Sequence, residues 1–198
     1  MSGVRFTPSA RMKNIEVEFR SQIDKKKYLS VLEFLAKNGQ DLGADDKRVW
    51  FFVTPDKLLK VTNNVSKQTA KITLKLARIG HGSSFEEIEF PIAEKDVEKA
   101  IRLFEELGHN YLVEPTILRR DFLYKGVEVA VKYSKTWGYH LELEVMIGSK
   151  DEEQSAEAKI RAVAEELDIK VMNDEELQAL TGKIEATYVN PTKLSKIR

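Results

Sequence analysis

The sequence predicts an α+β fold built on a largely antiparallel β-sheet. Strand-like segments outnumber helical ones, and they follow one another in groups instead of alternating strictly with helices. Several of them alternate apolar and charged residues, which gives each strand one face for a core and one polar face. A chain of 198 residues, of which 42% are hydrophobic, is long enough to bury the core of one such domain.

The overall composition argues against several classes of function. The 32 basic residues balance 32 acidic ones, so we expect no bulk binding of nucleic acid. Without cysteine the chain has no thiolate nucleophile, disulfide framework or cysteine-based zinc site, and this favours a cytoplasmic protein. No apolar run approaches the roughly 20 residues of a membrane span, so we expect no membrane partner.

The first quarter of the chain predicts a strand, a helix and a second strand. Lys13–Arg20 alternates strictly between apolar and charged residues. Asp24 is a suitable cap for a helix that ends near Asn38. The polar residues Gln40–Lys47 indicate a loop, and the β-forming run Val49–Val53 indicates a buried strand.

The second quarter predicts three strands and a helix. Leu58–Thr62 and Lys71–Arg78 are short alternating segments, and Glu86–Phe90 is a third. Pro91 is expected to end the third strand, since proline donates no hydrogen bond to a neighbouring strand. Apolar residues at helical spacing then predict a helix over Glu94–Leu107.

The next elements are a hairpin, a strand and a helix. Ile117–Tyr124 and Val127–Tyr133 flank the turn residues Lys125-Gly126, which indicates a β-hairpin. His140–Met146 alternates again and predicts a strand. A helix capped by Ser149 is expected to run through residue 167.

The C-terminal part predicts a short helix and one further extended piece. Asn173 is a suitable cap for a helix that ends near Thr181-Gly182, and Ile184–Val189 is expected to be extended. Residues 13–190 are therefore expected to form one domain. Residues 1–12 are expected to be a flexible N-terminal tail, and residues 191–198 a basic C-terminal tail.

Pairs of glutamates recur with the same spacing at both ends of the chain. Glu16 and Glu18 lie on the charged side of the first strand, and Glu142 and Glu144 lie on the charged side of a late one. Two such carboxylates are roughly 7 Å apart along one face, and like charges repel unless a cation offsets them. A third pair, Glu87 and Glu89, is explained equally well by a solvated strand edge.

Basic residues occupy the corresponding positions of the other strands. They are Arg20, Lys60, Lys75, Arg119 or Arg120, and Lys132. If the sheet closes, or nearly closes, into a β-barrel with flanking helices, acids and bases converge in one lumen. Basic side chains bind phosphate oxygens, and carboxylates hold Mg²⁺ together with substrate phosphates. Such a lumen would suit metal-assisted phosphoryl chemistry.

These motifs resemble the CYTH proteins, or triphosphate tunnel metalloenzymes. That superfamily includes class IV adenylyl cyclases, thiamine triphosphatases and inorganic triphosphatases. Its opening signature is E-x-E-x-K, and here Glu16 and Glu18 are followed by Arg20 in place of lysine. Its late signature is a glycine closely followed by E-x-E, which is similar to G-Y-H-L-E-L-E after residue 137. The resemblance covers residues 13–189 and implies a barrel lumen that binds a triphosphate with Mg²⁺ or Mn²⁺.

The resemblance also implies roles for individual residues. The metal ligands would be Glu16, Glu18, Glu142 and Glu144. The phosphate-binding residues would be Arg20, Lys60, Lys75, Arg78, Arg119, Arg120 and Lys183. Lys183 is included because CYTH proteins often carry a lysine shortly before a small residue and a tyrosine, here Thr187-Tyr188. The catalytic residues would be Glu16, Glu18 and Lys132.

Two positions depart from the family pattern. Lys132 stands where an aspartate usually helps to hold the metal, and Thr62 stands where a second basic residue is common. The first departure leaves three readings open. Metal binding relies on the glutamates alone, or Lys132 partly replaces a metal, or the protein binds its ligand without turnover.

The function expected from these features is metal-dependent hydrolysis of a triphosphate. Inorganic tripolyphosphate, thiamine triphosphate and nucleoside triphosphates are the candidate substrates. One alternative is a class IV-type adenylyl cyclase, and another is a non-catalytic module that binds polyphosphate or nucleotide. A two-carboxylate glycosidase is a weaker idea, because many basic residues share the face of the acids. Self-association into a homodimer stays open.

Overall fold

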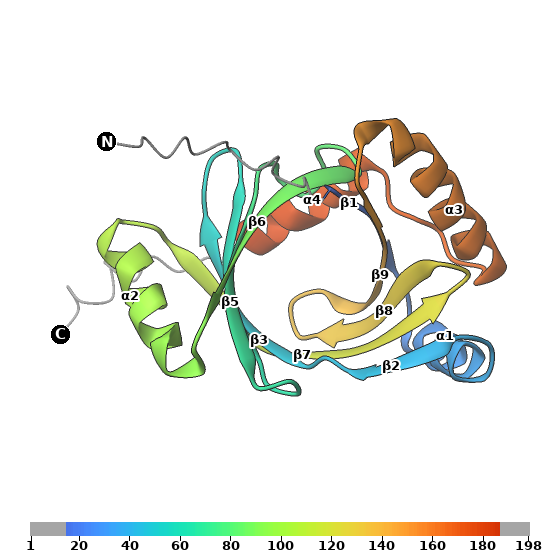
Figure 1. The fold of residues 1–198 in the computed structure, drawn as a ribbon, viewed down its shortest axis with the longest axis horizontal. Helices are drawn as coiled ribbons and strands as arrows, with labels where there is room; N and C mark the ends of the chain where they lie inside the picture. Colours follow the sequence, from blue (N-terminus) through green and yellow to red (C-terminus); the bar gives the residue numbers. More distant parts are fainter. Residues whose placement is uncertain (1–14, 187–198) are drawn as a thin grey trace, which may run out of the picture.

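The computed structural model describes residues 15–186 of the chain. The two predicted tails and Thr187-Tyr188 lie outside the described residues. Eight antiparallel strands close into a barrel, and a ninth strand and four α-helices lie outside it (Figure 1). This arrangement confirms the predicted α+β fold with a closed antiparallel sheet. None of the described helices has the length and apolar character needed to cross a membrane.

The barrel strands occur in two runs along the chain, separated by helices. The nine strands are β1 (Ile15–Gln22), β2 (Gln40–Ala44), β3 (Lys47–Val53), β4 (Leu58–Asn64), β5 (Thr69–Lys75), β6 (Ser84–Ile92), β7 (Tyr111–Tyr124), β8 (Val127–Ser134) and β9 (Gly138–Ile147). Around the barrel they follow the order β7-β3-β4-β5-β6-β1-β9-β8, and the pairing of β8 with β7 closes it. Strand β2 lies outside the barrel and pairs with residues 120–123 in the second half of β7.

The long strand β7 makes this closure possible. Its first half pairs with β3 and its second half pairs with β8. The sequence predicts only Ile117–Tyr124, because Pro115 looks like a strand boundary. The register passes from Val49 opposite Glu114 to Lys47 opposite Ile117, so β7 bulges at Pro115 and continues through it.

Four α-helices lie on the outside of the barrel. They are α1 (Lys25–Asn38), α2 (Val97–Glu106), α3 (Glu153–Glu166) and α4 (Asp174–Glu185), and short 3₁₀ turns at Glu94–Asp96 and Lys150–Glu152 precede α2 and α3. Figure 1 shows α2 on one side of the barrel and α1 and α3 on the other. Helix α2 packs over one apolar core on the outer faces of the strands, and α1 and α3 pack over the other. Because both cores lie outside the barrel, the lumen is free for polar side chains.

Several local predictions are wrong, each for a visible reason. Gln40–Lys47 is not a loop, because its first residues pair with β7 as β2. Strand β6 continues past Pro91, which lies opposite Lys71 at a point where β6 has no described partner on its other side. Ile184 is not extended, because it shares one buried helix face with Leu177 and so α4 runs on through Gly182.

Other turns and caps confirm the predictions. Lys125 and Gly126 both have positive φ angles, 50° and 74°, as a two-residue hairpin turn requires. Asp24 accepts a hydrogen bond from the backbone N–H of Lys27 at 2.7 Å and so caps α1. Asn173 and Glu176 form a capping box at the start of α4.

Candidate functional site

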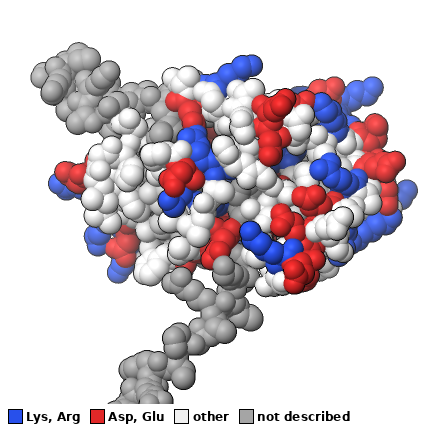
Figure 2. Space-filling view, turned by 90° about the horizontal axis from the view of Figure 1, so that it is seen from above, with Lys and Arg blue, Asp and Glu red and all other residues white. Residues whose placement is uncertain are grey.

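The barrel encloses a cavity of about 490 Å³ lined by charged side chains from all eight of its strands. On β1, Val17 and Phe19 point outward into a core, so Glu16, Glu18 and Arg20 point inward. The outer face seen in Figure 2 shows acidic and basic residues interspersed, with no broad patch of one sign. The lumen itself gathers many charged side chains of both signs.

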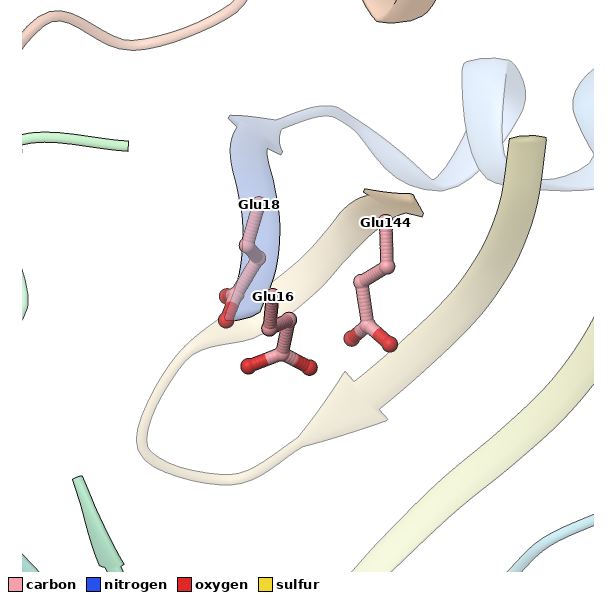
Figure 3. Close-up of side chains that lie close together, drawn as sticks. All are labelled: Glu16, Glu18 and Glu144. Carbon is pink, nitrogen blue, oxygen red and sulfur yellow. The ribbon is translucent and has the colours of Figure 1, made fainter. Parts of the chain in front are cut away.

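Three carboxylates meet in this cavity: Glu16, Glu18 and Glu144 have oxygens within 4.8 Å of one another (Figure 3). Glu18 and Glu144 lie directly opposite each other on β1 and β9. Burial, and then repulsion from the neighbouring glutamates, raises the pKa of Glu144 to about 8, although Arg119 opposes the shift. Three acids held this closely form a site that a cation would stabilise.

Lys75 from β5 contacts two members of the cluster. Its Nζ lies 2.7 Å from Oε2 of Glu18 and 3.0 Å from Oε1 of Glu87, and it also contacts Glu16. Burial alone would lower the pKa of Lys75, but these carboxylates raise it well above its usual value. Lys75 is therefore a permanent cation at the edge of the carboxylate cluster.

Arg119 from β7 reaches the other side of the cluster. Its guanidinium lies 2.6 Å from Asp121, 3.3 Å from Glu142 and 3.9 Å from Glu144. The adjacent Arg120 is exposed on the outside of the barrel, where it contacts Asp41 of β2. Of the two arginines considered, Arg119 is the one that faces the lumen.

Glu142 has a different environment from Glu144. Its oxygens lie 2.7 Å from Nζ of Lys132, 3.2 Å from Nε of Arg20 and 3.3 Å from Nη1 of Arg119. Burial would raise the pKa of Glu142, but these three cations hold it well below its usual value. The close cluster of acids does not include Glu142, and its role as a metal ligand stays a prediction.

Two basic residues of the lumen have lowered pKa values. Burial lowers the pKa of Lys132 to about 8, against the attraction of Glu142. Burial and then the nearby Lys75 lower the pKa of Lys60. Within residues 15–186 no hydrogen bond or ion pair is found for Lys60, so its ammonium is available to an anionic ligand.

Three residues expected to bind phosphate lie away from the lumen. Arg78 follows the end of β5 and contacts Glu185 of α4 and the carbonyl of Thr54. Lys183 is exposed on α4, and Arg120 faces outward as described. These three expectations are corrected: strand β5 ends at Lys75, α4 is helical where an extended piece was predicted, and alternation along β7 places only Arg119 inside.

The lumen also contains residues that sequence reasoning left out. They are Asp45, Lys47, Lys67, Lys71, Glu114, Asp121 and Glu128. The third glutamate pair belongs with them, since Glu87 and Glu89 both line the cavity; Glu87 is half-buried, whereas Glu89 is exposed to solvent. His140 lines it too, but burial and then Lys132 lower the pKa of His140 to about 4, so it is neutral at pH 7.

A family model identifies the family of the chain. The model described as "CYTH domain" matches residues 14–176. The chain belongs to the CYTH family. CYTH proteins bind triphosphate substrates, and the charged lumen is the place where this chain has the groups for it.

Solved structures share the CYTH fold of this chain. A conserved hypothetical protein from Pyrococcus furiosus is 27% identical, with a TM-score of 0.63 over 79% of this chain and 94% of that one. A candidate adenylate cyclase from Vibrio parahaemolyticus is 13% identical, with a TM-score of 0.62 over 83% and 92%. HpAC1 from Hippeastrum, described as having a dominant triphosphatase activity, is 14% identical, with a TM-score of 0.57 over 80% and 89%. A search of curated protein sequences found no significant match.

Proposed function

We propose that this CYTH protein is a divalent-metal-dependent triphosphatase. The observation that carries the proposal is the placement of the Glu16, Glu18 and Glu144 cluster beside buried basic side chains in one lumen. A site with only bases would bind phosphate, and a site with only acids would bind a metal. The combination suits a chelate of a triphosphate with Mg²⁺ or Mn²⁺.

Each group of residues has a distinct role in this proposal. Glu16, Glu18 and Glu144 hold the divalent ion, which when bound neutralises charge on the phosphates and makes the phosphorus more electrophilic. The phosphate oxygens are held by the basic residues that line the lumen, which are Arg20, Lys60, Lys75 and Arg119. Fixed cations of this kind stabilise the charge of a transferring phosphoryl group.

Lys132 acts in the proposal through Glu142. Their ion pair keeps Glu142 ionised, and Glu142 in turn orients Arg20 and Arg119 toward the carboxylate cluster. Lys132 is therefore a positioning residue in this scheme, and its ammonium adds one more positive charge to the lumen.

The two reactants are water and a triphosphate. A water oxygen attacks the terminal phosphorus, and the bond from that phosphorus to the bridging oxygen breaks. The products are phosphate, a diphosphate and one proton released from the water. HpAC1, described as a triphosphatase, supports this choice by its shared fold. A cyclase would use the same grip, but the 3′-hydroxyl of ribose would attack the α-phosphorus.

A product assay separates these outcomes. Purified chain is incubated with tripolyphosphate, thiamine triphosphate, ATP or GTP and with Mg²⁺ or Mn²⁺, and the products are separated by ion-exchange chromatography. We expect phosphate and the corresponding diphosphate from at least one substrate. Cyclic AMP from ATP would instead show a cyclase. Tight binding of every triphosphate without any product would show a binding module.

A further inference from the structure

Glu114 is a buried carboxylate of the lumen wall that has no role in the proposed function. It lies on β7, only 1% of its surface is exposed, and it lines the cavity. Neither of its carboxylate oxygens has a hydrogen-bond partner among the residues that the structure describes. A buried carboxylate without a partner is costly, so such a group indicates a partner that arrives with a ligand.

Part of the wall around Glu114 is apolar, and Lys47 of β3 lines the same cavity. Glu114 lies opposite Val49 of β3, and Phe51 and Ile117 belong to the same two paired strands. The apolar residues that line the cavity include Val49, Phe51, Leu58, Ile79, Ile117 and Trp137. Inorganic tripolyphosphate has no apolar surface to bury against these residues. The flat face of an organic ring could pack on them and be removed from water, which is favourable.

The apolar region also extends beyond the charged lumen. A smaller cavity of about 40 Å³ shares Phe51, Leu58, Ile79 and Trp137 with the main one and reaches Ile184 of α4. The main cavity of about 490 Å³ falls within the range of roughly 300–1,000 Å³ that is typical of small-molecule sites. The lumen therefore offers both a charged part and an apolar part to one ligand.

A metal ion is a poorer partner for Glu114 than an organic group. Within residues 15–186 the acids that meet closely enough to hold a metal are Glu16, Glu18 and Glu144. Glu114 is not among them, so an ion at Glu114 would have one carboxylate and an apolar wall. Two free carboxylate oxygens are instead suited to two parallel N–H donors.

We propose that the substrate is a nucleoside triphosphate whose base presents two adjacent N–H donors, as guanine does. The base lies on the apolar wall, N1–H and the 2-amino group donate to the two oxygens of Glu114, and the triphosphate lies among the acids and bases of the lumen. This inference rests on the proposed function for the position of the triphosphate. It goes further by assigning a base-recognition residue.

Isothermal titration calorimetry on the full chain without divalent metal tests the inference separately from catalysis. GTP, inosine triphosphate and tripolyphosphate are the probes. We expect wild type to bind GTP about 10-fold more tightly than inosine triphosphate, which lacks the 2-amino donor. Glu114→Gln should weaken GTP binding by about 10-fold to 100-fold and leave tripolyphosphate binding unchanged. Glu106→Gln, which removes an exposed carboxylate of α2, is the matched control.

Two results would overturn the inference. One is equal affinity of wild type for GTP and inosine triphosphate, a comparison that requires no variant. The other is an equal change in GTP and tripolyphosphate binding by Glu114→Gln, whether that change is zero or large. Phosphate release from the same nucleotides, measured separately with Mg²⁺ or Mn²⁺ added, keeps the two proposals apart. A preference for GTP without release leaves base recognition intact and removes the hydrolase, and release without that preference does the reverse.

Discussion

Nζ of Lys132 lies 2.7 Å from Oε1 of Glu142 inside the barrel. Arg20 and Arg119 approach the same carboxylate, so Glu142 is surrounded by cations. Two residues further along β9, Glu144 lies among other carboxylates instead. One strand thus presents two glutamates to the lumen in opposite electrostatic environments, and the pair offers a matched comparison.

The two isosteric substitutions of this pair should have different effects on stability. Glu142→Gln leaves three buried cations short of a counter-charge, and we expect it to lower the free energy of unfolding by about 3–5 kcal/mol at pH 7. Glu144 has a pKa raised to about 8, so it is largely protonated at pH 7 without metal, and Glu144→Gln should change stability by less than about 1 kcal/mol. Urea unfolding in EDTA measures both. Equal losses in the two variants would contradict this electrostatic assignment.

Neighbouring arginines on β7 provide a second comparison. Arg119→Gln should raise the KM for a triphosphate by about 10-fold or more, because it removes a charge-assisted contact in the lumen. Arg120→Gln should leave KM unchanged and alter stability by less than about 0.5 kcal/mol, since its ion pair with Asp41 is exposed. Steady-state kinetics gives the KM of both variants and shows which arginine contacts the triphosphate. A larger rise in KM from Arg120→Gln than from Arg119→Gln would mean that Arg120, and not Arg119, faces the lumen.

His140 predicts how stability depends on pH. Burial and the nearby Lys132 lower its folded pKa to about 4 from an unfolded value near 6.5, while Glu142 opposes the shift. The unfolded state therefore binds more protons between these values, and stability is lost as pH falls from about 6.5 to 4. The loss from this one residue should be on the order of 3 kcal/mol.

The variant His140→Gln isolates that contribution. Carboxylates with lowered pKa values, Glu142 and Glu87 among them, add to the acid sensitivity of both proteins. The difference between wild type and the variant should therefore be compared across pH 4–7 by urea unfolding. Parallel stability curves would show that folding does not shift the pKa of His140.

Much of the lumen could be predicted from alternation alone. In a strand, residues two apart share a face, so alternation predicts that Glu16 shares a face with Glu18 and that Glu142 shares one with Glu144. The order of the strands and the position of Lys75 beside Glu18 depend on barrel closure. That closure comes from contacts far apart in the sequence, which local patterns do not specify.

The errors at the site arise where local signals compete with tertiary pairing. Glu114 was missed because the following proline marks a boundary, whereas the bulge in β7 carries the strand past it. Asp45 and Lys47 were placed in a loop, because the polar stretch before β3 has no apolar alternation. Lys183 was assigned by its place in a motif, and the helical α4 leaves it exposed.

Glu114 also predicts a trade-off between binding and stability. Glu114→Gln removes a buried unpaired charge, and we expect the free energy of unfolding to rise by about 1–3 kcal/mol while GTP binding weakens. Thermal unfolding of the variant beside Glu106→Gln measures the first effect. A loss of stability would show that Glu114 has a structural partner in the folded protein.

The most direct test of the proposed function is phosphate release from tripolyphosphate and GTP, measured with Mg²⁺ or Mn²⁺ and again in EDTA. We expect release by wild type only when an ion is present. Glu144→Gln should lower the rate by about 100-fold or more, because it removes a proposed metal ligand without disturbing the fold. Release by Glu144→Gln at the wild-type rate, or release in EDTA, would contradict the assignment of the Glu16, Glu18 and Glu144 cluster as the metal site of a triphosphatase.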